Sequence, residues 1–245
     1  INLPVINETN GDLVATITVT PTYTNDGVDC TGPSEEFTIT VSPTAQVDQV
    51  EDIVVCNGDE VAEIVFATTS ENDIAYSWSI DTEIGTQSLT GVGNIPLFEA
   101  ENIGTDPIVA TVTVTPSNDE TDPSLTCEGS SIEFTITVNP TAQVDPVDSL
   151  DLCNGDTAVV DFTTSNGGVD SVTTYSWEIT GGDSVFVGGS LTGAGNINLP
   201  VINETNADLV ATVTVTPTYT NDGVDCTGPS AVSYTHLRAH ETINH

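Results

Sequence analysis

Apolar residues recur at every second position along most of the chain, which is the period of a half-buried β-strand. In residues 60–68 we expect Ala62, Ile64 and Phe66 to point inward. The same alternation gives two further inward sets, formed by Ile74, Tyr76, Trp78 and Ile80 and by Ile108, Ala110, Val112 and Val114. Turn residues separate these segments, and Gly and Pro are too frequent for a helix. The pattern therefore predicts an all-β protein.

The strand pattern repeats along the chain. Residues 1–34 recur as residues 197–230 with two changes, Gly11 to Ala207 and Ile17 to Val213. A more diverged copy lies between them, in which Cys56 and Cys153 occupy equivalent positions 97 residues apart. A repeat of this length suits one immunoglobulin-like sandwich with its own core. We therefore expect tandem immunoglobulin-like β-sandwich domains stacked end to end, because the linkers are too short for independent tumbling.

The repeat divides the chain into three expected domains and a tail. Residues 1–41 form the C-terminal part of one repeat, residues 42–138 a complete repeat, and residues 139–230 a repeat that lacks its own last strand. The first part holds only the last strands of a unit and cannot close a core alone. We expect it to be completed by an upstream part of the same polypeptide, or by a neighbouring protomer that donates strands.

The tail, residues 231–245, departs from the repeat. Where the first copy continues with Glu35-Glu36-Phe37, the last copy continues with Ala231-Val232-Ser233. All three His residues and the single basic residue, Arg238, lie in this tail. The segment resembles a translated sequencing adapter, and we interpret it as a non-native end.

Acidic residues dominate the charge. The chain has 37 Asp and Glu against one basic residue, for a net charge of −36, and residues 1–230 contain no Lys, Arg or His. Nucleic acid and anionic membrane surfaces are excluded as partners, because both are bound through cationic side chains. The usual general bases and nucleophile–His pairs are absent as well. Only carboxylates could serve catalysis, and they lie on outward positions and loops, so we expect no enzyme.

Several motifs have both a binding and a structural interpretation. The acidic loops supply the calcium candidates Asp26, Asp29, Asp119, Asp122, Asp222 and Asp225, for which a solvated turn is the simpler interpretation. Asn7 and Asn203 each begin an N-glycosylation sequon. Trp78 and Trp177 could stack on sugars, but their inward neighbours favour core packing. No catalytic or cofactor-binding residue is assigned, and calcium is the only ion considered.

Three of the motifs together resemble a known family. Cys-Asn-Gly-Asp at 56–59, Tyr-Ser-Trp at 76–78 and Thr-Gly-x-Gly-Asn at 90–94 each recur in the following repeat. They look like the PKD-like repeats of large secreted Bacteroidetes surface proteins, and the resemblance covers essentially residues 1–230. It implies an immunoglobulin-like sandwich, export to the cell surface, and a role in adhesins, gliding machinery or extracellular filaments.

The five cysteines include no Cys-x-x-Cys pair, which favours disulfides over a metal or redox site. We expect Cys56 at the end of the first strand of its domain, on the side where the chain leaves that domain. Cys127 lies in the last hairpin, at the opposite end of the domain. A bond between them would span a sheet about 25 Å long, against roughly 4.4–6.8 Å between the Cα atoms of a disulfide. Stacking would instead bring Cys56 to Cys226 of the next domain, and Cys30, Cys127 and Cys153 would pair outside this sequence. The intradomain pairs Cys56–Cys127 and Cys153–Cys226, and reduced thiols, stay open as alternatives.

These observations favour a structural or adhesive repeat segment of an extracellular stalk or filament at the cell surface. The expected partners are further copies of the same repeat or chain. Two alternatives stay open: an adhesion module that binds calcium or polysaccharide, and a spacer in a multidomain secreted enzyme.

Overall fold

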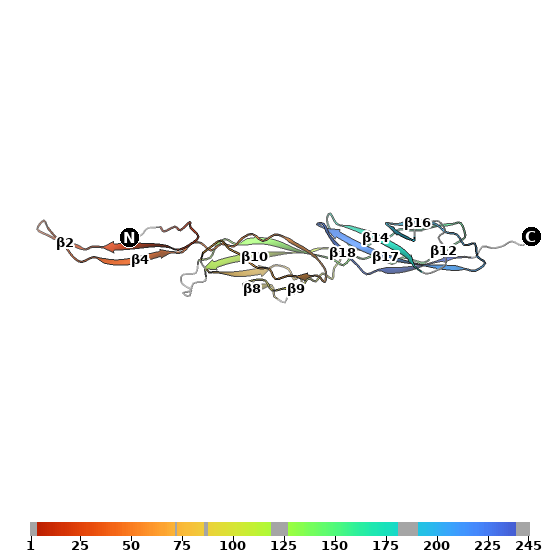
Figure 1. Ribbon diagram of the computed structural model, residues 1–245, viewed down its shortest axis with the longest axis horizontal. Helices are drawn as coiled ribbons and strands as arrows, with labels where there is room; N and C mark the ends of the chain where they lie inside the picture. Colours follow the sequence, from red (N-terminus) through yellow and green to blue (C-terminus); the bar gives the residue numbers. More distant parts are fainter. Residues whose placement is uncertain (1–3, 72, 86–87, 119–126, 181–190, 239–245) are drawn as a thin grey trace, which may run out of the picture.

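The computed structural model of the chain describes residues 4–71, 73–85, 88–118, 127–180 and 191–238. All regular structure in these residues is β-strand, and three groups of strands follow one another along one long axis (Figure 1). The second and third groups are immunoglobulin-like β-sandwiches stacked end to end, so the predicted fold class is confirmed. None of the described residues belongs to a helix with the length and apolar character needed to cross a membrane.

The second group has one large sheet and a small facing layer. The sheet has the strand order β5 (Ile53–Cys56), β11 (Ile132–Asn139), β10 (Ile108–Asn118), β7 (Ile74–Ile80) and β8 (Thr90–Val92). In the facing layer β6 (Glu60–Val61) pairs with β9 (Phe98–Glu99). Strands β5 and β11 run parallel, whereas the other neighbours in the sheet are antiparallel. Trp78, Ile95 and Phe134 lie in the core of this unit.

The third group repeats this arrangement. Its sheet has the order β12 (Leu150–Leu152), β19 (Ala231–Leu237), β17 (Leu209–Asn221), β14 (Val172–Thr180) and β15 (Thr192–Ala194). A short strand, β18 (Val224–Thr227), forms a hairpin with the end of β17. In the facing layer β13 (Thr157–Val160) pairs with β16 (Ile197–Pro200). The equivalent strand orders give Trp177 the core position that Trp78 has in the second unit.

The first group is only part of such a unit. In it β1 (Leu13–Val19) pairs with β4 (Glu35–Val41), and β2 (Thr22–Asn25) pairs with β3 (Val28–Thr31). Strand β1 corresponds to β17 of the third unit and β4 corresponds to β19. The β2–β3 hairpin corresponds to the β17–β18 hairpin. No described strand covers their inner face, so side chains such as Val19 and Phe37 are exposed.

The predicted inward positions are confirmed on the long strands, with one error near β6. Ile64 and Phe66 are buried as expected, but Ala62 is exposed and Val61 is buried in its place. In the third unit a single residue separates Ala158 from the inward-facing Val160, whereas two residues separate Val61 from Ile64. The extra residue breaks the period of two and ends β6 after Val61.

The segment after residue 230, which we interpreted as a non-native end, supplies the last strand of the third unit. Strand β19 pairs along β17 and runs parallel to β12. Thr235 and Leu237 point into the core, while Val232 and Tyr234 point outward. The segment fits this position because it alternates with a period of two and is rich in residues that favour strands.

Candidate functional site

The Thr-Gly-x-Gly-Asn motif holds the core tryptophan in place. A Cβ atom on Gly193 would lie 2.2 Å from Cζ2 of Trp177, so only glycine allows the ring to pack there, and Gly91 and Trp78 have the same relation. The next glycine, Gly195, turns the chain with a φ of 70°. The motif is therefore structural, and the prediction that Trp78 and Trp177 are core residues is confirmed.

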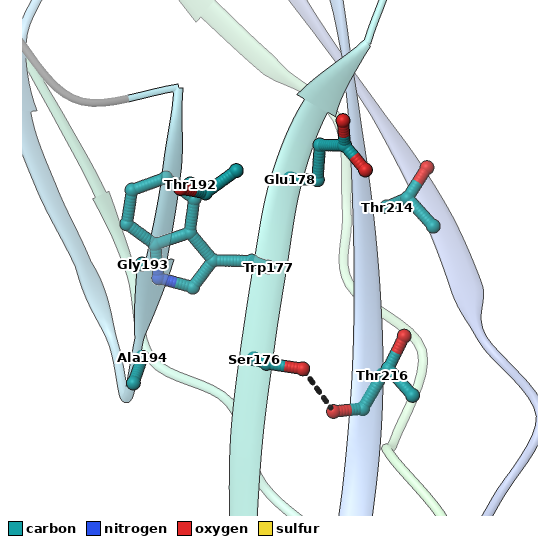
Figure 2. Close-up of a pocket in the computed structure, with 8 residues that line it drawn as sticks. All are labelled: Ser176, Trp177, Glu178, Thr192, Gly193, Ala194, Thr214 and Thr216. Atoms are coloured by element: carbon teal, nitrogen blue, oxygen red, sulfur yellow. Dashed lines mark hydrogen bonds between the residues drawn. The ribbon is translucent and has the colours of Figure 1, made fainter.

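An open hollow lies on the outward side of this motif in the third unit (Figure 2). Its lining includes Ser176, Glu178, Thr192, Thr214 and Thr216. The indole ring of Trp177 lies against Gly193 and is only 7% exposed, so it offers no open face to a sugar ring. The hollow lacks the aromatic platform that the polysaccharide alternative would need.

The acidic loops are tight hairpin turns. Asp26-Gly27 and Asp222-Gly223 have positive φ at both residues, as a two-residue hairpin turn requires. Asp29 and Asp225 instead accept cross-strand hydrogen bonds from Thr24 and Thr220, at 2.6 and 2.7 Å.

The described calcium candidates are not gathered into a cluster of acidic side chains. Calcium takes six to eight oxygen ligands. Among the described residues no three His, Cys, Asp or Glu side chains gather as a metal cluster. The candidates Asp119 and Asp122 lie outside the described residues.

Both sequon asparagines cap a loop, Asn203 from a buried position and Asn7 from a half-buried one. Asn203 is fully buried, and its Nδ2 donates to the carbonyl oxygens of Ala207 and Leu237, at 2.9 and 3.2 Å. Asn102 makes the equivalent bonds in the second unit, where Gly104 replaces the sequon threonine. The position needs asparagine for folding, and the nitrogen that a glycan would occupy is already used.

The Cys-Asn-Gly-Asp motif forms a turn at the end of β5 that presents Cys56. The Cys56 amide donates to Asp59 Oδ2 at 2.9 Å, and the Asp59 amide donates back to the Cys56 carbonyl at 3.1 Å. Gly58 adopts a φ of 86° between them. Asn57 accepts the Asn102 amide at 2.7 Å, which ties the turn to the neighbouring loop. The motif thus fixes a cysteine at the end of the unit.

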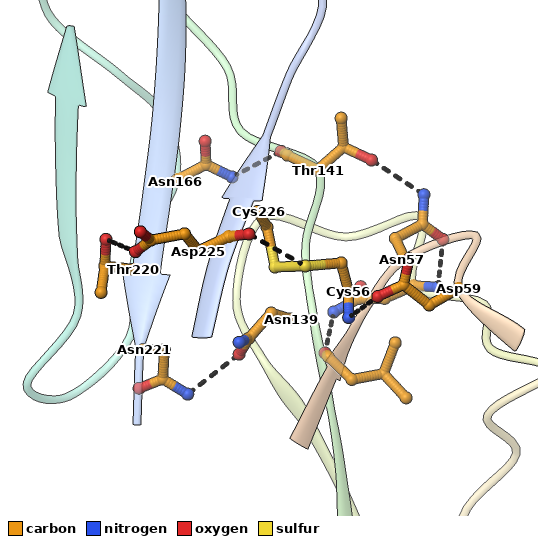
Figure 3. Close-up of a disulfide and its surroundings, with 12 residues drawn as sticks. Cys56, Asn57, Asp59, Asn139, Thr141, Asn166, Thr220, Asn221, Asp225 and Cys226 are labelled. Carbon is orange, nitrogen blue, oxygen red and sulfur yellow. Dashed lines mark hydrogen bonds between the residues drawn. A yellow bond between two sulfur atoms is a disulfide. The ribbon is translucent and has the colours of Figure 1, made fainter. Parts of the chain in front are cut away.

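A disulfide joins Cys56 of the second unit to Cys226 in the β17–β18 hairpin of the third (Figure 3). Their Cα atoms are 5.5 Å apart, although 170 residues separate them in the sequence. This is the pair expected from stacking, and neither alternative pair, Cys56–Cys127 or Cys153–Cys226, forms. Cys226, Tyr219 and Ala142 make a small buried cluster around the bond, against which Val224 packs.

Hydrogen bonds reinforce the junction around the disulfide. They join Asn57 Nδ2 to Thr141 Oγ1 at 2.8 Å, Asn221 Nδ2 to Asn139 Oδ1 at 2.9 Å, and the Gly167 amide to the Thr105 carbonyl at 3.0 Å (Figure 3 shows the first two). Backbones also meet directly, because a Cβ atom on Gly228 would lie 1.8 Å from the Ala142 carbonyl oxygen. The two units are therefore held together by covalent and polar contacts, and the first residues of the third unit pack closely against its own hairpin.

The junction between the first and second units repeats part of this pattern. The Glu71 amide donates to the Asn10 carbonyl at 2.9 Å, which corresponds to the bond from Gly167 to Thr105. Within the second unit, Gly129 lies over the Ala45 carbonyl as Gly228 lies over Ala142 within the third. The recurrence of these contacts indicates one stacking geometry along the chain.

Sequence reasoning predicted the cysteines of the junction but missed its packing residues. Pro-Thr-Ala at 43–45 and 140–142, and the glycine two residues after Cys127 and Cys226, recur in the sequence. Those recurrences were the available signal. The role of these recurring residues depends on which backbone segment packs against them, and the sequence alone does not show this.

The remaining cysteines, Cys30, Cys127 and Cys153, are exposed and make no disulfide in the structure. Cys30 and Cys127 occupy the hairpin position of Cys226, whereas Cys153 occupies the turn position of Cys56. The second and third units therefore each carry one cysteine in the turn and one in the hairpin, whereas the first group carries only the hairpin cysteine.

Burial and hydrogen bonding shift the pKa values of two tyrosines and one aspartate among the described residues. Burial raises the pKa of Tyr76, and Asp48 adds to the effect; burial and Asp145 do the same to the pKa of Tyr175. The Thr111 amide, which donates to Asp81 at 2.8 Å, lowers the pKa of that carboxyl group. These shifts have structural causes and form no catalytic pair.

No protein-family model matches the chain, and no curated protein sequence matches it. Among solved structures, cadherin domains 3–6 of protocadherin gamma B2 match at 15% identity over 94% of this chain and 59% of that one, with a TM-score of 0.39. Three N-terminal domains of the Hoc outer capsid protein of bacteriophage RB49 match at 12% identity over 93% and 89%, with a TM-score of 0.46. Domains FN1–FN3 of chicken CNTN1 match at 12% identity over 91% and 76%, with a TM-score of 0.32. These similarities are too weak to carry function, and the fold assignment rests on the strand pairing above.

Proposed function

We propose that this chain is a structural or adhesive segment of an extracellular stalk or filament, in which immunoglobulin-like units are stacked end to end and stapled by disulfides. It performs no catalysis. The observation that carries the proposal is the Cys56–Cys226 bond between consecutive units. We propose that the units run from residue 42 to 138 and from residue 139 onward, with residues 1–41 the end of a preceding one.

Three physical properties support this proposal. A covalent link at one side of the junction, with backbone hydrogen bonds at the other, restricts bending between units. Disulfides persist mainly in oxidising, extracellular compartments, which agrees with the location implied by the PKD-like motifs. The net charge of −36 makes neighbouring arrays repel one another, so that long polymers stay dispersed.

The test is to compare the oxidised chain with Cys226→Ser, using Cys30→Ser as the matched control. An acid-specific protease under non-reducing conditions should release the peptides of Cys56 and Cys226 as one linked species. Small-angle X-ray scattering should show a rigid rod for the wild type and for Cys30→Ser, and a more flexible chain for Cys226→Ser. Absence of the linked peptide, or equal rigidity in all three proteins, contradicts the proposal.

The adhesion-module and enzyme-spacer alternatives have no specific observation in their favour within the described residues. No three acidic, His or Cys side chains gather at the described acidic turns, and Trp177 beside the hollow is only 7% exposed.

A further inference from the structure

We infer that Asn10 is a site of spontaneous deamidation, and that its conversion loosens the junction between the first and second units. The chain has four Asn-Gly pairs, which begin at Asn10, Asn57, Asn154 and Asn166. Three of these pairs are held in hydrogen bonds that oppose the reaction, and Asn10 is the exception among the described residues. The inference does not depend on the Cys56–Cys226 bond, which lies at the other junction.

Deamidation at such a pair requires a main-chain nitrogen to reach the preceding side chain. The Gly11 amide nitrogen loses its proton to a base in the solvent and attacks Cγ of Asn10, whose side-chain nitrogen takes up a proton and leaves as ammonia. Water then opens the cyclic imide to aspartate or isoaspartate. Glycine favours the attack because it has no Cβ atom to crowd the nitrogen. A hydrogen bond on either group opposes the reaction, since that bond must break first.

The pairs in the two Cys-Asn-Gly-Asp turns are held at both groups. The Gly58 amide donates to the Ala100 carbonyl at 2.8 Å. Asn57 Oδ1 accepts the Asn102 amide at 2.7 Å. The turn at Asn154 repeats these two bonds at 3.0 and 2.8 Å. The nitrogen that would attack and the side chain that would be attacked are therefore both fixed in these turns.

The Asn166 pair is held by the junction between the second and third units. The Gly167 amide donates to the Thr105 carbonyl at 3.0 Å. Asn166 Nδ2 donates to the Thr141 carbonyl at 3.2 Å, and its Oδ1 accepts the Gln143 amide at 2.6 Å. These bonds would have to break before the imide ring could close.

No such bonds restrain the Asn10 pair among the described residues. The Asn10 side chain is exposed and makes no hydrogen bond there, and the Gly11 amide donates none. The loop is nevertheless fixed, because Asn7 Nδ2 donates to the Gly11 carbonyl at 2.8 Å. In the second unit, where Asn102 Nδ2 donates to the Asp106 carbonyl, the Asp106 amide likewise makes no hydrogen bond within the described part of the chain. The free amide is therefore a property of this loop.

Conversion of Asn10 would disturb the contact between the first and second units. The Asn10 carbonyl accepts the Glu71 amide at 2.9 Å. In isoaspartate the main chain runs through the former side chain, so this carbonyl no longer leads to Gly11 and the loop must shift. The new carboxylate also arises beside Glu71, whose Oε2 would lie 2.7 Å from a Cβ atom on Gly11, and like charges repel. At the other junction Thr105 occupies the position of Asn10, so the same reaction cannot occur there.

The test follows the four Asn-Gly pairs in the full chain at neutral pH, by mass spectrometry of pepsin peptides. In the folded chain Asn10 should convert about tenfold faster, or more, than the other three pairs, because each of those must first break hydrogen bonds. In guanidinium chloride the four rates should converge, since each pair is the same dipeptide. Equal rates in the folded chain overturn the inference.

Gly11→Ala is the matched variant, because the recurring segment already carries Asn206-Ala207. The added methyl group meets only the end of the Glu71 side chain, which can move aside. Conversion of Asn10 in this variant should fall toward the slow rate at Asn206.

The effect on the junction is read by NMR at the Glu71 amide. Its hydrogen exchange should become faster as Asn10 converts and should stay slow in Gly11→Ala. Conversion without faster exchange at Glu71 also overturns the inference, because the modification would then leave the junction intact. The linked Cys56–Cys226 peptide is mapped in the same samples, and its presence or absence decides the proposed function separately.

Discussion

The chain contains one sequence in two environments. Residues 1–34 and 197–230 differ at two positions, yet Val5 and Val19 are 60% and 49% exposed, whereas Val201 and Val215 are at most 1% exposed. The strands themselves are alike, since β1 pairs with β4 as β17 pairs with β19. What differs is the rest of the unit, because β12 and β14 flank the second copy and no described strand flanks the first.

The comparison separates local folding from burial. Alternation and turn chemistry are enough to form the hairpins and their register in both copies. Stability from the hydrophobic effect is added only where facing strands remove side chains from water. Matched substitutions in the two copies therefore measure the contribution of tertiary contacts at constant local sequence.

The largest difference is expected for the paired tyrosines. Tyr219→Ala should destabilise the third unit by about 3–5 kcal/mol, because it leaves a cavity in the junction and removes the hydrogen bond to the Gly167 carbonyl. Tyr23→Ala should change stability by less than about 0.5 kcal/mol, as at an exposed site. Hydrogen exchange in increasing denaturant, read on pepsin peptides of each unit, gives both values. Equal effects would mean that Tyr23 is also buried in solution.

A smaller difference is expected for the paired glycines of the hairpins. Gly228→Ala drives a methyl group into the Ala142 backbone and should weaken the junction by about 2–3 kcal/mol, whereas Gly32→Ala meets only the Pro21 ring at 3.1 Å. Faster hydrogen exchange of the amides of residues 139–143 in Gly228→Ala, with the core of the third unit still protected, would show that the junction is weakened. Unchanged exchange there would show that the hairpin does not approach the Ala142 backbone so closely.

The next largest difference in stability is expected for the paired sequon asparagines, Asn203 and Asn7. Asn203→Ala leaves the Ala207 and Leu237 carbonyls without their donor in a buried place and should cost about 1–2 kcal/mol. Asn7→Ala removes similar bonds at a half-exposed site, so water can replace them and the loss should be smaller. Thermal unfolding of the two variants tests whether Asn203→Ala loses more stability than Asn7→Ala. Asn203→Asp serves as a control of nearly the same side-chain size. A glycan attached to Asn203 in a natively exported sample would contradict this role.

The smallest effect is a pH dependence confined to the second unit. The pKa of Asp81 is lower in the folded chain than in the unfolded chain, so its contribution to stability is present above the unfolded pKa. That contribution is lost as the pH falls through the folded value, below about pH 4. In an NMR titration the Thr111 amide should lose protection over that range in the wild type. In Asp81→Asn the amide should show no such step, and the Thr212 amide, opposite Thr180 in the third unit, serves as the control.

Several features could be predicted because they depend on short-range patterns. The period of two placed Trp78 and Val112 in the core, and the internal repeat gave the unit length and the stacking from which Cys56–Cys226 was expected. Ala62 was wrongly predicted to point inward because one added residue shifts the alternating pattern by one position. No nearby sequence signal reveals such a shift. The sequence of residues 231–237 departs from the repeat, so the repeat did not predict β19 there, although the alternation of these residues suits the same sheet position.

By itself, the sequence determined the all-β class, the repeat, the acidic turns and the absence of Lys, Arg and His from residues 1–230, since each follows from residue types and their spacing. Only the tertiary structure decided which copy of residues 1–34 is buried, which glycines allow two backbones to meet, and which cysteines stay exposed. The physical reason is that burial and disulfide pairing depend on what lies opposite a residue, and identical segments of this chain have different neighbours.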